Sequence, residues 1–356
     1  MIKKPRTKTL ILNAMILIVT VLIAASSYWI YKTRDLGPKP EISDLPDEKA
    51  PALLVIDQQN NLDAKLKNDL QKKTELKLAR TKKSVYDYQQ LNLEMPKSMR
   101  GLASQCRSGI VINESKQTIL WAKKPDKAVP IASMTKLMTI LVAMEIINAD
   151  ETLSLDSMVR VSRAAERVPP TEVWLAAGHD YRIGDLMRAS MIRSANDACY
   201  ATAEGLAPGR DMSKFIIIMN RRARELGLRY SRFYNVHGLP GRSASQDNRA
   251  SVMDIAIIAQ EVMKHAKIME WTGSRTGKFV HYNGKVVDLV SSNKLLNKVE
   301  GITGLKTGYI RRSGFCIAVS ADRDGEKRIA IITGFKSKYR RNDFAKELIN
   351  WAYTNE

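Results

Sequence analysis

The chain has 356 residues, with 57 basic and 37 acidic side chains and a formal net charge of +20. The basic residues are spread along the whole chain, so attraction to anionic surfaces and simple solubility explain the charge equally well. None of the four histidines falls in a metal-ligand spacing such as H-E-x-x-H. They are His179, His237, His265 and His281. The composition gives metal catalysis no support, and we expect neither a metal nor a cofactor.

Residues 10–31 form an apolar segment without a charged side chain. About 20 such residues span a bilayer. Basic residues precede the segment and mark its cytoplasmic side. They are Lys3, Lys4, Arg6 and Lys8. We therefore expect residues 1–9 in the cytoplasm, a single-pass anchor in the inner membrane at residues 10–31, and an extracytoplasmic or periplasmic location for every later residue. This location argues against nucleic acid as a partner.

A cleaved signal peptide is the alternative for the same segment. Ala24-Ala-Ser-Ser27 resembles a small-residue cleavage site, and cleavage would release the protein to the periplasm. The apolar run nevertheless continues through Tyr28-Trp-Ile-Tyr31, whose aromatic residues are typical of a membrane interface. The sequence favours the uncleaved anchor.

Residues 32–100 differ in character and predict a charged linker or stalk. Residues 35–51 hold four prolines and many charges, a composition that suits an extended, solvated chain. Leu62, Leu66 and Leu70 then recur at helical spacing among lysines within residues 61–92. This thin stripe is compatible with a basic helical stalk and equally with a partly disordered tether.

The first chemical motif is Ser133-Met-Thr-Lys136, which fits S-x-x-K. Residues 137–147 after it are apolar almost all the way round a helix, which predicts a buried helix. Lys136 would lie one turn from Ser133 on the same face, near the positive end of the helix dipole. Ser291-Ser-Asn-Lys294 fits the same pattern but has no such helix after it, so Ser133 is the better candidate.

Two further motifs follow in order, Ser194-Ala-Asn196 and Lys306-Thr-Gly308. The second lies in a strand-like segment, residues 304–310. Two more predicted strands follow it, at residues 315–321 and 328–333, joined by the turn Asp322-Arg-Asp-Gly325, where glycine suits a positive φ. A last helix is predicted near residues 343–353.

The three cysteines are an odd number for an oxidising compartment. Cys199 follows Asn196 on a probable helix and is expected to be a small buried apolar residue. Cys316 falls within a predicted strand. The sequence does not decide whether two of the three, Cys106, Cys199 and Cys316, form a disulfide.

In this order the three motifs resemble those of the low-molecular-mass penicillin-binding proteins, the D-alanyl-D-alanine carboxypeptidases of the S11 serine peptidase family. The resemblance covers roughly residues 101 to 340. It includes Val236-His-Gly-Leu239 and Asn293-Lys-Leu-Leu296, with Ala195 where the family usually has glycine. His237, in this loop, is expected to stabilise the loop.

The resemblance implies a β-lactamase/transpeptidase-like fold of the α/β (α+β) class over residues 101–356. In that fold an antiparallel sheet is flanked by helices and carries an all-helical subdomain. Only 48 residues follow Gly308, so we expect no extra β-domain and no amphipathic membrane helix of the kind found in many relatives.

The implied reaction removes the terminal D-alanine from peptidoglycan stem peptides, with β-lactams as covalent inhibitors. Ser133 is the nucleophile and Lys136 its proton acceptor, provided that burial and the nearby Lys306 lower the pKa of Lys136. Ser194 would bridge the two lysines and relay a proton. The expected substrate-binding residues are Asn196, Lys306, Thr307, Gly308 and Tyr309. By resemblance, the backbone amides of Ser133 and Tyr309 would form the oxyanion hole.

Three alternatives are weighed against this function. Relatives of similar length include endopeptidases that cleave D-alanyl cross-links. Class A β-lactamases have a deacylating glutamate in an E-x-x-x-N pattern ahead of K-T-G. Glu225 here begins E-L-G-L-R, so this pattern is missing. A non-catalytic cell-wall binding module has no need of the intact Ser133 and Lys136.

Overall fold

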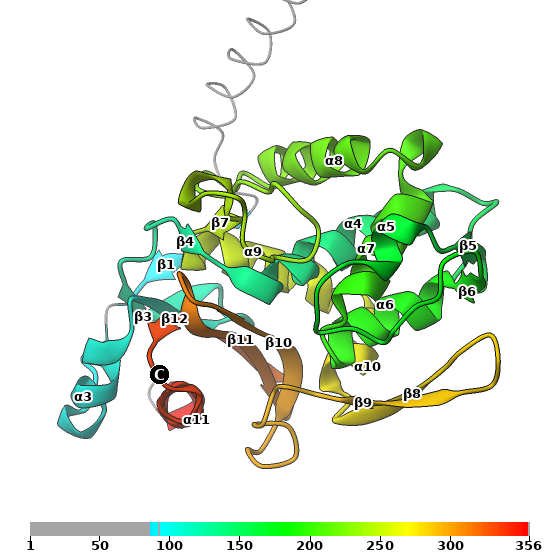
Figure 1. The fold of residues 1–356 in the computed structure, drawn as a ribbon. Coiled ribbons are helices and arrows are strands. Elements are labelled where there is room, and N and C mark those ends of the chain that lie inside the picture. The colour runs from blue at the N-terminus through cyan, green and yellow to red at the C-terminus, as the bar shows by residue number, and fades with distance from the viewer. Residues whose placement is uncertain (1–85, 92, 355–356) are drawn as a thin grey trace, which may run out of the picture. The chain divides into compact units, whose positions relative to one another are not determined.

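The computed structural model describes residues 86–91 and 93–354 (Figure 1). All of them belong to one unit, Leu70–Glu356. The predicted anchor at residues 10–31 and most of the predicted linker lie outside the described residues. The placement of the anchor therefore stays a prediction.

A six-stranded sheet forms the centre of the unit, and its strand order is β1-β3-β2-β12-β11-β10. The strands are β1 (Gln89–Gln90), β2 (Ser108–Asn113), β3 (Thr118–Lys123), β10 (Ile302–Ile310), β11 (Gly314–Arg323) and β12 (Glu326–Phe335). The last three confirm the strands predicted from the sequence. Neighbouring strands run antiparallel, except that β1 pairs in parallel with β3. The sheet is therefore mixed. The expectation of an antiparallel sheet is corrected at β1, which pairs in parallel with β3.

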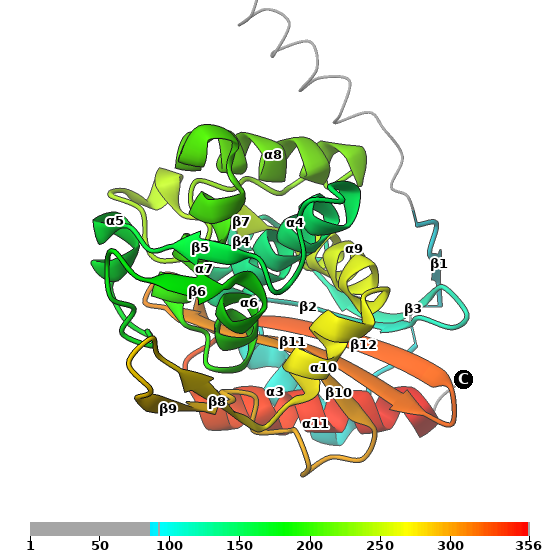
Figure 2. The same ribbon diagram turned by 90° about the vertical axis from the view of Figure 1, so that its right-hand side faces the viewer.

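Both faces of the sheet are buried, which explains the nearly continuous apolar runs in its strands. Because successive side chains point to opposite faces, Ile110 and Ile112 enter one core while Val111 enters the other. Helices α3 (Lys97–Gln105) and α11 (Lys338–Thr354) cover one face. Helices α9 (Val252–Met263) and α10 (Ala266–Gly273) cover the other (Figure 2). Helix α11 confirms the predicted last helix.

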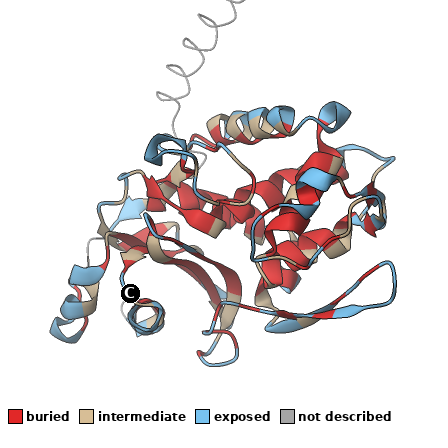
Figure 3. Ribbon diagram, viewed as in Figure 1, coloured by how far each residue is buried: buried red, intermediate tan, exposed pale blue. Residues whose placement is uncertain are grey.

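Helix α4 (Thr135–Ala149) lies between the sheet and the helical subdomain, and its apolar residues are buried almost all round (Figure 3). This confirms the buried helix predicted after Ser133. With the preceding turn it is long and apolar enough to cross a membrane, the only such helix among the described residues. Its burial identifies it as a core helix.

A subdomain packs against α4 and α10. Its helices are α5 (Arg163–Glu166), α6 (Ile183–Ile192), α7 (Asn196–Leu206) and α8 (Met212–Glu225). It also contains a two-stranded sheet of β5 (Met158–Arg160) and β6 (Asp180–Arg182), so the expectation of an all-helical subdomain is corrected. Two other small sheets complete the unit, formed by β4 (Val129–Pro130) with β7 (Arg249–Ala250) and by β8 (Thr276–Val280) with β9 (Val286–Val290).

Part of the predicted linker belongs to the folded unit. The hydroxyl of Tyr86 donates to Glu261 Oε1 over 2.7 Å, and the hydroxyl of Tyr88 donates to Gln260 on α9. Met95 and Met99 are buried in the core beneath α11. Folded structure therefore begins before residue 101, the start expected from the family motifs.

The three cysteines are free and buried. Cys199 is fully inaccessible, as expected for a small apolar core residue, and Cys316 lies in β11. The open question of a disulfide is thereby answered for this structure: none is formed among Cys106, Cys199 and Cys316.

Candidate active site

Ser133 lies in a short 3-10 turn, η1 (Ala132–Met134), immediately before α4. Two glycines bring other segments against this turn. A Cβ on Gly308 would approach the Ile131 carbonyl oxygen to 2.7 Å, and one on Gly238, where φ is +84°, would approach the Ala132 carbonyl oxygen to 2.0 Å. Any side chain at either position would push β10 or the loop away from the nucleophile. The missing side chain at Gly308 therefore lets β10 pack directly against the backbone that leads into Ser133.

Lys136 is fully buried, and three oxygen atoms surround its ammonium group. Its Nζ donates to Asn196 Oδ1 over 2.6 Å, to the His237 carbonyl over 2.8 Å and to Ser133 Oγ over 3.4 Å. Burial lowers the pKa of Lys136 from 10.5 to about 8. A lysine with this pKa can exchange a proton with the adjacent serine near neutral pH.

Asn196 is buried, and both ends of its side-chain amide form hydrogen bonds within the protein. Its Nδ2 donates to the Pro169 carbonyl over 2.9 Å, and its backbone N–H donates to the Thr171 carbonyl over 2.6 Å. Asn196 therefore orients Lys136 and holds it against the loop at residues 169–175. One N–H and one oxygen lone pair of its amide are not used by these bonds, and its contact with a substrate amide stays a prediction.

The next residue, Asp197, holds the loop at residues 169–175 against α7. Its carboxylate accepts hydrogen bonds from the backbone N–H groups of Val173, Leu175 and Ala198. Desolvation raises the pKa of Asp197, while these backbone donors oppose the rise. The loop contributes Pro170 and Thr171 to the wall of the cleft, a role that the sequence analysis missed.

Ser194 lines the cleft with its backbone in the left-handed region, at φ 68°. Within the described part of the chain its hydroxyl makes no hydrogen bond. The expected bridge between the two lysines is therefore not formed in this structure. A hydroxyl that faces the cleft without a partner is still available to a bound substrate.

Strand β10 is the edge strand of the sheet and carries the third motif. Lys306 is buried, and its Nζ donates to the Thr307 carbonyl over 3.4 Å, its one hydrogen bond among the described residues. Burial, and next the nearby charge of Lys136, lower its pKa well below 10.5. Thr307 Oγ1 shares a hydrogen bond with Ser292 Oγ. Tyr309 is exposed and stacks on Phe315 with 4.3 Å between ring centroids.

These elements enclose an open cleft of about 740 Å³. Five of the eight predicted site residues line it, namely Ser133, Ser194, Thr307, Gly308 and Tyr309. Lys136, Asn196 and Lys306 are buried behind its surface. Ser292, from the stretch rejected above as a decoy, is also part of the wall.

Arg341 and Asn342 line the cleft from α11, and no sequence pattern predicted them. Arg341 is buried, and its Nη1 donates to the Cys316 carbonyl over 2.5 Å. Burial lowers its pKa to about 10. Neither Arg341 Nε nor Asn342 Oδ1 has a hydrogen-bond partner among the described residues. No motif marks these residues, because only the fold brings α11 to the cleft.

His237 is a loop residue in this site and not a base. Its Nδ1 accepts a hydrogen bond from the Leu239 N–H over 3.1 Å, and its carbonyl accepts the bond from Lys136. Burial, and next the charge of Lys136, lower its pKa to about 3, so the ring is neutral at physiological pH. The predicted stabilising role is confirmed.

A serine hydrogen-bonded to a buried lysine, beside the edge strand of a helix-flanked sheet, defines a transpeptidase-like fold with a serine–lysine site. The family model described as D-alanyl-D-alanine carboxypeptidase, Peptidase S11, matches residues 95–337. The chain belongs to this family of serine peptidases.

Individual relatives agree with this assignment. The D-alanyl-D-alanine carboxypeptidase DacF of Bacillus subtilis is 28% identical over 253 residues, covering 71% of this chain and 63% of that protein. The chain thus matches somewhat less than two thirds of that relative's length. A D-alanyl-D-alanine endopeptidase of Pseudomonas aeruginosa is 24% identical, covering 73% of this chain and 82% of that protein. Ampicillin-bound Penicillin-Binding Protein D2 of Listeria monocytogenes is 25% identical, with a TM-score of 0.62, covering 70% of this chain and 97% of that chain.

Proposed function

We propose that this protein is a serine-type D-Ala-D-Ala carboxypeptidase that trims peptidoglycan stem peptides through an acyl-enzyme on Ser133. The proposal rests on Lys136. Its buried Nζ is hydrogen-bonded to Ser133 Oγ, and burial lowers the pKa of Lys136 to about 8. A nucleophile paired with a base of this kind suits acyl transfer. The S11 family and its named carboxypeptidases support the choice of substrate.

In the first step, Ser133 Oγ attacks the carbonyl carbon of the penultimate D-alanine and its proton passes to neutral Lys136. The backbone amides of Ser133 and Tyr309 stabilise the oxyanion. The C–N bond then breaks, and the leaving amine takes up a proton, which the hydroxyl of Ser194 can relay. Water hydrolyses the resulting ester and restores Ser133.

The carboxylate of the substrate has three candidate donors on the sheet side of the cleft: Lys306, Thr307 and Arg341. A carboxylate bound here raises the pKa of Lys306 by favouring its charged form. The bound carboxylate balances the charge of Lys306 beside Lys136, whose own lowered pKa of about 8 reflects burial. Lys136 is thus left as the proton acceptor of the reaction.

An endopeptidase acting on D-alanyl cross-links is the second candidate. The cleft of about 740 Å³ is also lined by Arg193 and Tyr339, beyond the predicted site residues, and this room supports a larger leaving group. The similarity to an endopeptidase supports this candidate, at lower identity than that to DacF. Both reactions leave a free carboxylate on the leaving side, so the preference for the carboxypeptidase rests on two motifs. Ser194-Ala-Asn-Asp-Ala198 and Gly304-Leu-Lys-Thr-Gly-Tyr309 resemble the carboxypeptidase branch of the family.

The decisive experiment compares two substrates. Diacetyl-lysyl-D-alanyl-D-alanine should release free D-alanine, and the Ser133→Ala variant should not. Purified cross-linked muropeptides are digested in parallel and the products are separated by chromatography. Dimers resolved to monomers, with no D-alanine released from pentapeptides, would assign the endopeptidase activity instead.

Membrane attachment through residues 10–31 is part of the same proposal. The uncharged apolar segment and its basic flank support it. The full chain should stay in the membrane fraction after high-salt washing, and deletion of residues 1–31 should release it. A mature N-terminus near Ser27 would show cleavage instead of anchoring.

A further inference from the structure

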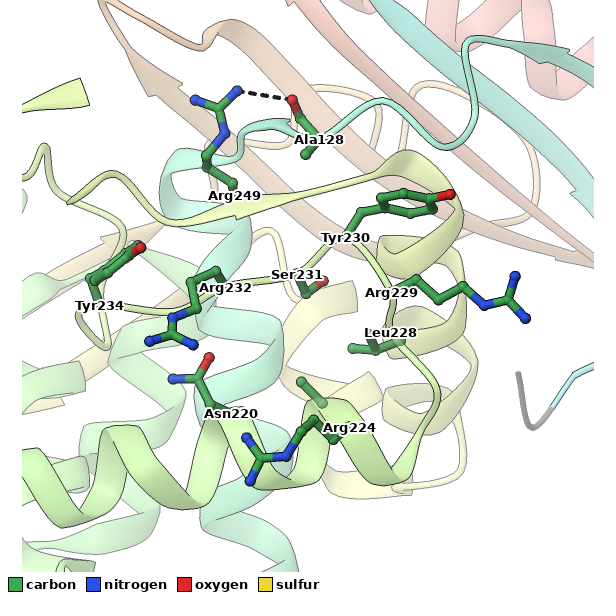
Figure 4. A pocket seen from close by; sticks show the side chains of 11 residues that line it. Ala128, Asn220, Arg224, Leu228, Arg229, Tyr230, Ser231, Arg232, Tyr234 and Arg249 are labelled. Atoms are coloured by element: carbon green, nitrogen blue, oxygen red, sulfur yellow. Dashed lines mark hydrogen bonds between the residues drawn. The ribbon is translucent and has the colours of Figure 1, made fainter. Parts of the chain in front are cut away.

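A second concave site lies apart from the catalytic cleft and shares no lining residue with it. It is a pocket of about 440 Å³ formed by α8, the segment at residues 228–234 and β7. Four arginines line it, together with two tyrosines, and no carboxylate is among its lining residues. The arginines are Arg224, Arg229, Arg232 and Arg249. We call it the arginine pocket (Figure 4).

Two of its arginines flank one asparagine. In Figure 4 the guanidinium groups of Arg224 and Arg232 lie on either side of the Asn220 side chain. Asn220 connects the two elements, because its Nδ2 donates to the Ile216 and Phe233 carbonyls over 2.9 and 2.8 Å and its Oδ1 accepts from the Phe233 N–H. Asn220 therefore fixes the segment that carries Arg232 against the helix that carries Arg224.

Three of the four arginines are not neutralised by a described carboxylate. No ion pair with a carboxylate of the described residues is formed by Arg224, Arg232 or Arg249. Arg249 Nη2 instead donates to the Ala128 carbonyl over 3.0 Å. The guanidinium carbon of Arg232 lies 5.6 Å from the Tyr234 ring centroid.

Two buried carboxylates on adjoining segments are hydrogen-bonded to groups other than Arg224 and Arg232. Arg312 binds Asp247, and Asp254 accepts from the Tyr230 N–H and the Ser231 hydroxyl. Several like charges in one concavity attract a multivalent anion.

We propose that the arginine pocket binds the phosphate group of an anionic ligand, a phosphate monoester or diester. Guanidinium groups match phosphate oxygens in bidentate geometry, and phosphate offers more acceptor oxygens than a carboxylate to the two neighbouring donors, Arg224 and Arg232. A phospholipid headgroup and a soluble phosphate ester supply the same chemistry. This inference is independent of the peptidase activity proposed for the cleft.

The test is a calorimetric titration of the full chain in a neutral detergent. The ligands are inorganic phosphate, glycerol 3-phosphate and a short-chain phosphatidylglycerol, with succinate as a dianion without phosphorus. Saturable phosphate binding is expected, with weaker binding of succinate. A phosphatidylglycerol affinity at least about tenfold above that of glycerol 3-phosphate identifies a lipid as the source, and equal affinities identify the phosphate ester alone.

The variant for this test is Arg224→Gln/Arg232→Gln, which removes two guanidinium groups that make no ion pair with the described residues. We expect phosphate affinity to fall at least about tenfold, since each charge-assisted contact is strong. The matched control, Lys214→Gln/Arg221→Gln, removes two charges from exposed positions of the same helix and should bind as the parent does. Thermal unfolding checks that both variants fold. Absence of saturable binding, equal binding of succinate, or an equal loss in the control would overturn the proposal.

Discussion

The two walls of the catalytic cleft differ in how completely their polar groups are bonded. On the helical wall, Lys136 makes three hydrogen bonds and Asn196 bonds at both ends of its amide. On the sheet wall, Lys306 makes a single long hydrogen bond, while Arg341 Nε has no described partner. We expect the helical wall to be preorganised for chemistry and the sheet wall to be completed by a bound ligand. This difference matches a division between a proton-transfer side and a carboxylate-binding side.

The strongest test of the helical wall is Ser133→Ala. Loss of the nucleophile should reduce peptide hydrolysis by about 10⁵-fold or more. Labelled penicillin should no longer attach, because its carbonyl occupies the place of the D-alanine carbonyl. Peptide mapping of the labelled parent protein locates the adduct. An adduct on Ser291, or a Ser133→Ala protein that still labels, would contradict the assignment.

The sheet wall is tested by Lys306→Ala. We expect kcat/KM for peptides with a free terminal carboxylate to fall by about 100-fold, as for the loss of one partner of a buried charge pair. An otherwise identical peptide amide should lose much less, since it carries no carboxylate to bind. Lys338→Ala is the matched control, because Lys338 lines the same cleft from an exposed position. Equal losses for acid and amide would break the proposed division between the walls.

The lowered pKa of Lys136 on the helical wall predicts a pH dependence. Lys136 accepts a proton only when neutral, and its pKa is about 8. The rate of acylation by penicillin should therefore rise by about tenfold from pH 7 to pH 9 and then level off. Asn196→Asp places a carboxylate beside Lys136, favours the ammonium form, and should move this rise to higher pH. A rate that is flat between pH 6 and pH 9.5 would exclude Lys136 as the base.

The parts of the site that the sequence predicts are those that depend on local patterns. Ser133 with its buried helix and Lys306 with its strand are local patterns, and the periodicity of apolar residues suffices to find them. The mixed sheet and the two-stranded insert in the subdomain depend on pairing between distant segments. Neither pairing leaves a local signal.

The partners of the site residues were also beyond local patterns. Arg341 reaches the cleft only because α11 packs across the sheet. The loop at residues 169–175 does so only because Asp197 binds its backbone. Arg341 follows Lys306 by 35 residues, a separation at which no motif connects them. A search of the last helix for basic residues would have yielded Arg341 among several other candidates.

The smallest expected effect concerns Ser292, which links the rejected decoy motif to the sheet wall. Its hydroxyl shares a hydrogen bond with Thr307 Oγ1, a proposed carboxylate donor. Ser292→Ala removes that bond without removing a charge, so KM should rise by about fivefold, the value of one neutral hydrogen bond, while kcat stays nearly unchanged. Ser291→Ala is the neighbouring control, because the Ser291 hydroxyl accepts from the Asn293 N–H and not from Thr307. A fall in kcat with unchanged KM would mean that Thr307 acts on the reacting groups, and the division between a binding wall and a chemical wall would then fail at this residue.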